Sequence, residues 1–245
     1  MEFNKEYETQ MKCNPSNTLK VFKETGMLKQ YIPELDNLEL CDQNLAKHPE
    51  GNVFNHIILA LSDANNQSMK VINAITFHDI GKLVTKKGTR YPNHDIKGVP
   101  IAEEILIDLQ RPDDEIDCVL FCVENHMRIH DILEMKPLDR LKIYTNEYFN
   151  ELCYVYKADT YGRSKECKIN KIINDRNILI KNENDPLVNE KEILAYGIAS
   201  NEVKTIMNDL IQKQANGKIK NKFEALRFIK SKYVKWNISN LTFAI

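Results

Sequence analysis

Residues 71–82 read VINAITFHDIGK, and this stretch guides the interpretation of the whole chain. Its first seven residues are mostly apolar, as in a segment that faces a protein core. His78 and Asp79 follow directly on the apolar run. An ionised carboxylate facing a core is costly unless a cation or a metal ion compensates its charge. The pair therefore predicts a partner elsewhere in the chain.

The composition of the 245-residue chain narrows the class of protein and favours one large domain, with or without an appended subdomain. The 34 Lys and Arg nearly balance the 35 Asp and Glu, so no global field toward nucleic acid or membranes follows. The cysteines form no Cys-x-x-Cys pair, which favours reduced thiols over a disulfide frame or a zinc ribbon. The start, MEFNKEYETQ, is unlike a signal peptide, and no apolar stretch reaches membrane-spanning length. We expect a soluble cytoplasmic protein.

Apolar residues recur at i, i+3 and i+4 along most of the chain, which is the spacing of amphipathic helices. Residues 53–61, 101–109 and 116–123 show this pattern, and residues 138–149 and 152–161 continue it. Prolines, glycines and asparagines separate these segments. Alternating strand pairs are not found. We therefore predict an all-α fold, a helical bundle.

The chain is expected to have three regions, with a polar stretch, KNENDP at 181–186, as a linker before the last of them. These regions are a helical lead-in at 1–47, a central domain at 48–184 and a C-terminal helical subdomain at 185–245. In the last region we predict three helices: near 190–196, near 201–214 and near 222–232.

All six histidines lie between residues 48 and 130. His56 lies on the apolar-faced helix just before the helix that carries His78 and Asp79. The short polar turn between these helices makes them antiparallel neighbours, so His56 can face His78. Asp79 can reach the same point from the rim of its helix. Asp159, which lies among apolar and aromatic neighbours, is the best candidate for a fourth ligand.

These four side chains form a mixed nitrogen and oxygen ligand set. Such a set suits Mn²⁺, Fe²⁺, Co²⁺, Ni²⁺, Zn²⁺ or Mg²⁺ better than a thiolate-seeking ion. If His94 and His126 also point inward, and Asp79 bridges, a second metal ion would bind. Two ions would then hold both the attacking and the leaving oxygen of a phosphoryl group.

Each of these residues also has a simpler interpretation. A lone histidine on an apolar helix face, such as His56, is usually a hydrogen-bonded core residue. His48 reads as a loop histidine, and His130 reads equally well as a surface residue. Asp159 can instead pair with Arg163, one helical turn later.

The pattern His56, His78–Asp79 and Asp159 resembles the HD superfamily of metal-dependent phosphohydrolases. Within it, the sequence is most similar to the HD domain of bacterial CCA-adding tRNA nucleotidyltransferases. The resemblance covers roughly residues 17–235 and implies an HD-domain helical bundle with a C-terminal helical extension. His94 and five segments carry it: VFKETGML at 21–28, IPELD at 32–36, HPEGNV at 48–53, FHDIGK at 77–82 and ADTYGR at 158–163.

One part of that family has no counterpart before the HD region. The nucleotidyltransferase head carries a Gly-Ser segment followed by paired aspartates that hold its catalytic metals. Only a short stretch without these features precedes the HD-like region. We therefore expect a stand-alone hydrolase rather than an enzyme that adds nucleotides.

Residues near the expected ligands receive roles on this basis. Three are expected to be catalytic: Asp79, Lys82 and His126. Four are expected to bind substrate: Lys82, His94, Arg90 and Arg163. Lys82 lies one helical turn from His78 and can neutralise a phosphate oxygen or the leaving group, or equally act as a helix C-terminal cation. Arg163 can bind phosphate with two donors, as the resemblance implies.

The resemblance implies hydrolysis of 2′,3′-cyclic phosphates, 2′-nucleotides or related phosphomonoesters, on nucleotides or RNA ends. Two alternatives stay open. One is a small-nucleotide phosphatase similar to the HD-type 5′-deoxynucleotidases, and the other is a non-catalytic RNA- or nucleotide-binding module that keeps metal for structure. Between Lys213 and Lys235, basic residues greatly outnumber the single acid, Glu224. This segment could bind an RNA backbone, although a lysine-rich helix is more often a solvated face.

Overall fold

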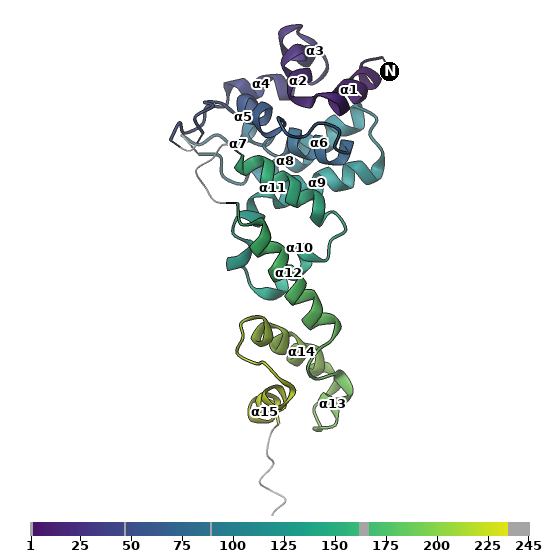
Figure 1. The fold of residues 1–245 in the computed structure, drawn as a ribbon, viewed down its shortest axis with the longest axis vertical. Helices are drawn as coiled ribbons and strands as arrows, with labels where there is room; N and C mark the ends of the chain where they lie inside the picture. Colours follow the sequence, from purple (N-terminus) through teal and green to yellow (C-terminus); the bar gives the residue numbers. More distant parts are fainter. Residues whose placement is uncertain (1, 47, 89, 162–166, 235–245) are drawn as a thin grey trace, which may run out of the picture. The chain divides into compact units, whose positions relative to one another are not determined.

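The structure, a computed structural model, describes residues 2–46, 48–88, 90–161 and 167–234. Helices joined by turns and short loops make up these ranges, which contain two isolated β-bridges and no strand (Figure 1). The prediction of an all-α fold is therefore confirmed. No helix in the described ranges combines the length and the apolar character needed to cross a bilayer.

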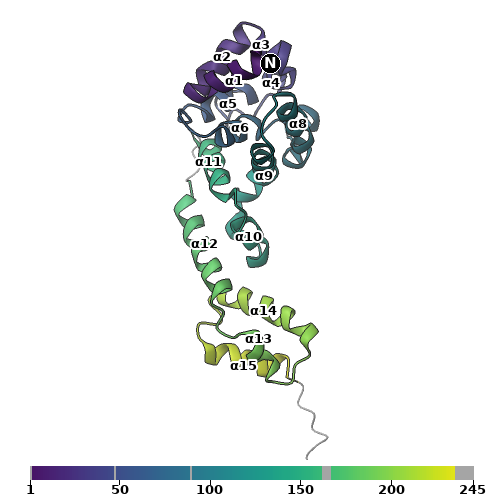
Figure 2. The same cartoon turned by 90° about the vertical axis from the view of Figure 1, so that its right-hand side faces the viewer.

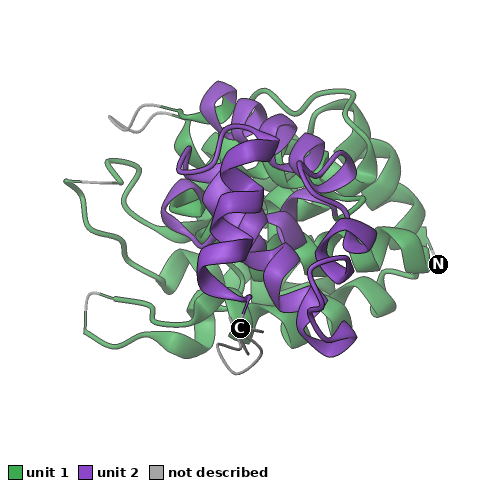
Figure 3. Cartoon of the chain, turned by 90° about the horizontal axis from the view of Figure 1, so that it is seen from below, with its two compact units in different colours: residues 1–132, 146–169 green, residues 133–145, 170–245 purple. Residues whose placement is uncertain are grey.

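The chain divides into two compact units, which Figure 3 shows in different colours. Unit 1 comprises Met1–Ile132 and Asn146–Ile169, and unit 2 comprises Leu133–Thr145 and Asn170–Ile245. Both units are therefore built from two separate stretches of the chain. The three predicted regions are continuous stretches of the chain, unlike these units, and their boundaries stay a prediction.

Short helices open unit 1, and aromatic side chains join them. Pro15 and Pro33 begin two of them, at a position where the missing N–H costs nothing. The rings of Phe3 and Phe22 lie 5.6 Å apart in the core. These elements are α1 (Glu2–Cys13), α2 (Pro15–Glu24), α3 (Met27–Tyr31), α4 (Pro33–Asn37) and the 3₁₀ helix η1 (Leu38–Leu40).

The rest of unit 1 forms around α6. Figure 2 shows α5, α6, α8, α9 and α11 gathered there; α6 packs against α9 and α11, and α8 packs against α9. The side chains of Asn52 and Ser68 cap the N-termini of α5 and α6. The helices are α5 (Val53–Ala60), α6 (Met69–Phe77), α7 (Lys82–Thr85), α8 (His94–Asp108), α9 (Asp113–His130) and α11 (Phe149–Thr160).

Helix α6 is buried on all sides, and only Lys70 among its residues is not fully buried. A helix that is apolar all round belongs in the interior of a protein. The residues that follow it, 78–82, are buried as well. The end of α6 therefore delivers His78 and Asp79 into the interior.

A chain of polar side chains satisfies the one amide on α6. The hydroxyl of Tyr7 donates to Asn73 Oδ1 at 2.7 Å, and the Asn73 amide donates to Glu115 at 2.6 Å. Arg111 binds both oxygens of Glu115, at 2.8 and 3.0 Å, and Glu8 at 3.0 Å. Burial raises the pKa of Tyr7, so its hydroxyl stays a donor. These bonds join α1, α6 and α9.

Gly81 lies where the backbone of α8 comes closest to the end of α6. A Cβ atom on Gly81 would lie 2.0 Å from the carbonyl oxygen of His94 and 2.5 Å from the backbone nitrogen of Gly98. Glycine alone permits this approach. The glycine of HDIGK thus lets the first turn of α8, with His94, pack against the segment that carries His78 and Asp79.

Unit 2 is also helical, and the bounds of its last three helices agree closely with the predicted ranges. A core around Ile193, Ile206 and Ile229 holds them together. The helices are α10 (Pro137–Tyr144), α12 (Ile169–Asn184), α13 (Glu190–Leu194), α14 (Ser200–Ala215) and α15 (Lys222–Lys232), and the 3₁₀ helix η2 (Ile132–Glu134) lies at the boundary with unit 1.

The predicted linker at 181–186 is wrong for its first four residues, which form the last turn of α12. Ile172 and Leu179 are buried on this helix. Because the end of this helix is polar, it was interpreted from the sequence as a linker. The sequence contains no proline or glycine between the start of α12 and Pro186, so nothing in it interrupts the helix earlier.

Candidate metal centre

Three helices meet at the four residues predicted as metal ligands. α5 supplies His56, α11 supplies Asp159, and the end of α6 supplies His78 and Asp79. His56 Nε2 lies 2.9 Å from Asp159 Oδ1 and 4.0 Å from Asp79 Oδ2. His78 Nε2 lies 3.4 Å from Asp79 Oδ2 and 3.6 Å from Asp159 Oδ1. We call these residues the first ligand set; each side chain is at most 4% exposed.

The other oxygen of Asp79 faces a second group. His94, the first residue of α8, places Nε2 at 3.1 Å from Asp79 Oδ1, and His126 of α9 places Nε2 at 3.6 Å from the same oxygen. The two Nε2 atoms lie 3.1 Å apart. We call Asp79, His94 and His126 the second ligand set. Asp79 therefore contributes one carboxylate oxygen to each set.

Three of the imidazoles are held in the same way. The Nδ1 atoms of His78, His94 and His126 lie within 2.8 Å of the backbone carbonyl oxygen three residues earlier. A carbonyl oxygen only accepts, so Nδ1 carries a proton, and in the neutral imidazole Nε2 presents a lone pair to the site. His78 Nε2 is buried, and the described residues offer it no hydrogen bond.

A cation could bind these lone pairs. His78 Nε2 faces two carboxylate oxygens, and the Nε2 atoms of His94 and His126 face one another. The separations given above do not exceed 4.0 Å. Two atoms bound to one ion at about 2.1 Å each lie no more than about 4.2 Å apart. Imidazole nitrogens and carboxylate oxygens suit divalent ions of the Mn²⁺ to Zn²⁺ series. Three residues of the first set, His56, His78 and Asp79, and the whole second set could therefore hold metal ions.

The electrostatics of the site keep both aspartates ionised. Burial alone would raise the pKa of each carboxyl group. At Asp79 the charge of Lys82 and the neighbouring His78 outweigh burial and hold the pKa well below its usual range. At Asp159 the hydrogen bonds from His130 and His56 do the same. Both carboxylates are therefore ready to bind a cation.

The pKa values of the histidines in the second ligand set move in opposite directions. Although burial opposes it, the hydrogen bond to Asp79 raises the pKa of His94. Burial lowers the pKa of His126, and the neighbouring His78 adds to that effect. His94 is therefore the member of this set for which protons compete most.

Lys82 compensates the charge of Asp79 directly. Its Nζ donates to Asp79 Oδ2 at 2.6 Å and to Gln43 Oε1 at 2.9 Å. The side chain is 10% exposed. The partner that the HDIGK sequence requires for its aspartate thus lies within the same motif.

A hollow of about 480 Å³ opens beside the second ligand set. Lys82 and His94 lie in its wall, so it reaches both the buried ion pair and a ligand nitrogen, and the exposed Arg90 adds a further cation. Its lining consists of Gln43, Asn44, His48, Lys82, Arg90, Tyr91, His94 and Met127. Arg163, also predicted to bind substrate, lies outside the described residues.

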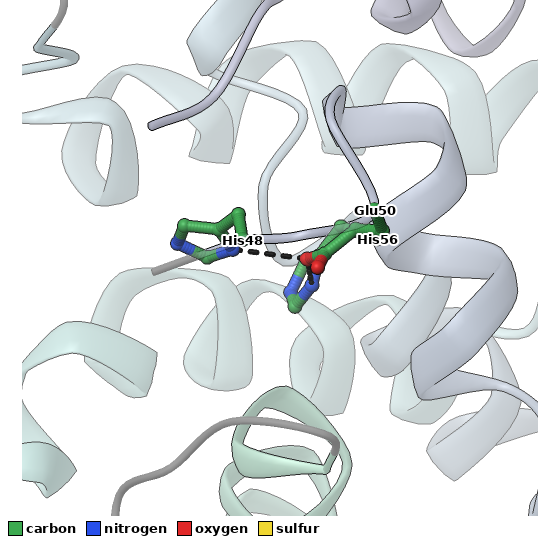
Figure 4. A group of neighbouring side chains, drawn as sticks. All are labelled: His48, Glu50 and His56. Atoms are coloured by element: carbon green, nitrogen blue, oxygen red, sulfur yellow. Dashed lines mark hydrogen bonds and ion pairs between the residues drawn. The ribbon is translucent and has the colours of Figure 1, made fainter. Parts of the chain in front are cut away.

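Two residues of the site were missed or misread from the sequence. His130 Nε2 lies 2.6 Å from Asp159 Oδ2 with its side chain 7% exposed, so the surface interpretation of His130 is wrong. Glu50 Oε1 lies 2.8 Å from His56 Nδ1 and 3.0 Å from His48 Nδ1, between the two rings (Figure 4). His130 follows His126 by four residues, on the same face of a helix, and this spacing was the available signal.

The basic C-terminal segment is partly neutralised within unit 2. Lys222 pairs with Glu192, and Lys232 pairs with Asp209. A second hollow, of about 280 Å³, collects other cations beside an aromatic ring. It is lined by Lys213, Lys218, Ile219, Glu224, Arg227, Phe228 and Ser231. Lys235 lies outside the described residues.

Sequence comparison finds relatives that share about half of the chain. The Multifunctional CCA protein of Halorhodospira halophila is 31% identical over 131 residues, which are 52% of this chain and 32% of that protein. The protein of the same name from Alkalilimnicola ehrlichii is 31% identical over 133 residues, 53% of this chain and 32% of that protein. The one from Methylobacillus flagellatus is 28% identical over 165 residues, 63% of this chain and 40% of that protein.

The resemblance to CCA-adding enzymes predicted from the sequence is therefore confirmed. The aligned part spans about a third to two fifths of the length of these relatives. No protein-family model matches the chain. No solved structure matches it either.

Proposed function

We propose that the chain is a metal-dependent phosphohydrolase that cleaves phosphoester bonds of nucleotides or RNA ends, as a 2′,3′-cyclic phosphodiesterase, 2′-nucleotidase or phosphatase. One observation carries this proposal: the two oxygens of Asp79 face two separate ligand sets beside a hollow lined with cations. The relatives named Multifunctional CCA protein support a nucleotide-processing enzyme.

Metal ions in the two sets would supply hydroxide near neutral pH and polarise a phosphoryl oxygen. His56, His78 and Asp159 would hold one ion, and His94 and His126 the other, with Asp79 between them. His126 is 1% exposed, so its predicted catalytic part is that of a ligand.

The hollow supplies the charges that a phosphate needs. Phosphoryl transfer depends mainly on positioning and on neutralising negative charge. Lys82 lies in the wall with its ammonium on Asp79, and it can turn that ammonium to a phosphate oxygen once another cation holds the carboxylate. Arg90 approaches the same space from the surface and would bind a second phosphate oxygen.

RNA is the proposed macromolecular partner. The resemblance to tRNA nucleotidyltransferases favours an RNA substrate, and unit 2 adds a basic hollow with an aromatic wall. Lys213 Nζ lies 4.7 Å from the centre of the Phe228 ring, and Lys218 and Arg227 line the same hollow. Cations beside an aromatic face suit a phosphate backbone with stacked bases.

A substrate panel tests the proposed function. The purified protein would be assayed on 2′,3′-cyclic AMP, 2′-AMP, 5′-dAMP and p-nitrophenyl phosphate, each with Mn²⁺, Ni²⁺, Co²⁺ or Mg²⁺. We expect turnover of the 2′,3′-cyclic or 2′-phosphate substrate. Turnover of 5′-dAMP alone would favour a 5′-deoxynucleotidase-like enzyme, and no turnover with any metal would favour a non-catalytic binding module. Asp79→Ala should remove turnover, whereas Asp108→Ala, at an exposed position of α8, should not.

A further inference from the structure

His56 differs from the other histidines of the two ligand sets in the partner of its Nδ1 atom. His78, His94 and His126 each donate Nδ1–H to a backbone carbonyl. His56 instead donates to the carboxylate of Glu50, at 2.8 Å. An ionised carboxylate in this position strengthens the opposite ring nitrogen as a ligand more than a neutral carbonyl does.

The loop before α5 fixes Glu50 at this place. The side-chain amide of Asn55, in the first turn of α5, donates to the backbone oxygen of Glu50 at 3.1 Å. Asn52 caps the same helix, accepting from the Asn55 backbone N–H at 2.8 Å. The side chain of Glu50 is 10% exposed. The carboxylate is therefore held by the same helix start that carries His56.

We propose that Glu50 is a positioning residue of the metal centre: it keeps the proton of His56 on Nδ1 and turns Nε2 toward Asp79 and Asp159. The proposal rests on the proposed function only in that a metal ion binds the first ligand set. It also makes the two sets unequal, because Glu50 adds a negative charge behind the first set. The first set should therefore bind its ion more tightly than the second.

Glu50 also contacts His48. Its Nδ1 lies 3.0 Å from the same Glu50 oxygen (Figure 4), and its side chain lines the hollow of about 480 Å³. Glu50 thus ties a residue in the wall of the hollow to a metal ligand. The same three side chains could alternatively hold an ion of their own, and the experiment separates these two roles.

The test is the affinity for Mn²⁺, measured by calorimetric titration of the metal-free full chain. We expect Glu50→Ala to weaken binding at the first ligand set by about 10- to 100-fold, the usual effect of losing such a partner. Glu50→Gln should fall between Ala and the natural residue, because its oxygen accepts the same hydrogen bond without the charge. Glu124→Gln, at an exposed position of α9, is the matched control and should leave the affinity unchanged.

A spectroscopic readout separates positioning from general damage to the fold. In protein labelled with ¹⁵N-histidine, the Nδ1-bound proton of His56 should stay protected from exchange in Glu50→Gln and lose that protection in Glu50→Ala. If Glu50→Ala does not fold, Glu50→Gln carries the affinity test, with a smaller expected loss.

Two results would overturn the proposal. One is an unchanged affinity of the first ligand set in the Glu50 variants. The other is the loss of one bound ion while the remaining affinities stay intact, which would mean that His48, Glu50 and His56 hold their own ion. Failure of the proposed function looks different. Affinity that depends on Glu50, together with no turnover in the substrate panel, would refute the phosphohydrolase and keep the positioning role.

Discussion

The ammonium of Lys82 lies 2.6 Å from Asp79 Oδ2, the oxygen that belongs to the first ligand set. Both side chains are buried. A metal ion at that set would compensate the same charge that Lys82 compensates. The lysine and the ion therefore compete for one oxygen, and without metal the fold depends on the lysine.

Lys82→Met should expose this dependence. Removing one partner of a buried ion pair costs about 3–5 kcal/mol, because the other charge is left uncompensated. We expect a clearly lower melting temperature for the metal-free variant, and a larger rise on adding Mn²⁺ than in the natural protein. Thermal unfolding followed by circular dichroism, with EDTA or Mn²⁺, measures both.

The matched control is Lys86→Met. Lys86 is 48% exposed and lies 3.7 Å from an oxygen of Asp42. Exposed pairs of this kind contribute about 0–1 kcal/mol, so its melting temperature should hardly change. Equal melting temperatures for the metal-free Lys82 variant and the natural protein would show that the lysine does not compensate Asp79.

The shared carboxylate predicts how many ions each variant binds. We expect two Mn²⁺ per natural chain, one in Asp159→Asn, which damages the first ligand set, and one in His126→Gln, which damages the second. Asp79→Asn should lose tight binding at both sets, since each uses one of its oxygens. Calorimetric titration with elemental analysis counts the ions. If the natural protein binds a single ion, and His126→Gln does not affect that ion, then the second ligand set does not bind metal.

Much of the first ligand set could be predicted from the sequence, because its central pair violates an apolar pattern. His78 and Asp79 follow a buried run and need compensation, and the turn after α5 makes His56 a neighbour of that pair. The 5.4 Å between the rings of His56 and His78 shows how close the two helices bring them. Regular periodicity also located α15.

The contacts of the missed residues depend on geometry that a spacing pattern does not contain, although the spacing from His126 does place His130 on the same helix face. Glu50 lies in a loop, and its direction is set by backbone and side-chain bonds to the start of α5. His130 reaches Asp159 across two helices that are distant in sequence. The pairing of Lys82 with Asp79, three residues earlier, was not predicted, and the phosphate role of Lys82 stays a proposal. The contact of His130 with Asp159 follows from tertiary packing, whereas Lys82 and Asp79 are local neighbours.

Gly81→Ala should separate α8 from the end of α6. The new Cβ would lie 2.0 Å from the carbonyl oxygen of His94, so the backbone must move. Overpacking costs typically about 1–3 kcal/mol, or a fall of roughly 2–4 °C in melting temperature per kcal/mol for a chain of this size. The shift of His94 should also weaken Mn²⁺ binding at the second ligand set. Val84→Ala, at a position 65% exposed, is the control, and a variant as stable as this control would refute the close approach.

Tyr7→Phe should lower stability without touching the metal centre. It removes the donor to Asn73 Oδ1 and leaves a buried acceptor unsatisfied. Such a loss costs about 1–3 kcal/mol. We expect a lower midpoint of urea unfolding with an unchanged Mn²⁺ affinity. Tyr31→Phe, on a ring 48% exposed, should leave the midpoint in place. A midpoint for Tyr7→Phe equal to that of this control would mean that the buried network contributes nothing.

The stabilisation of the fold by metal should grow with pH. Burial opposes protonation of His56 and His94, but hydrogen bonds to carboxylates outweigh it and raise the pKa of both. In the metal-free protein these protonated pairs stabilise the fold below about pH 6.5, the unperturbed histidine pKa, and their contribution is lost as the pH rises through the higher folded values. Metal binding requires the deprotonated nitrogens, so it strengthens over the same range. We therefore expect saturating Mn²⁺ to raise the melting temperature more near about pH 7.5 than near about pH 5.5, as scanning fluorimetry would measure. An equal rise at both pH values would mean that protons do not compete with metal at these histidines.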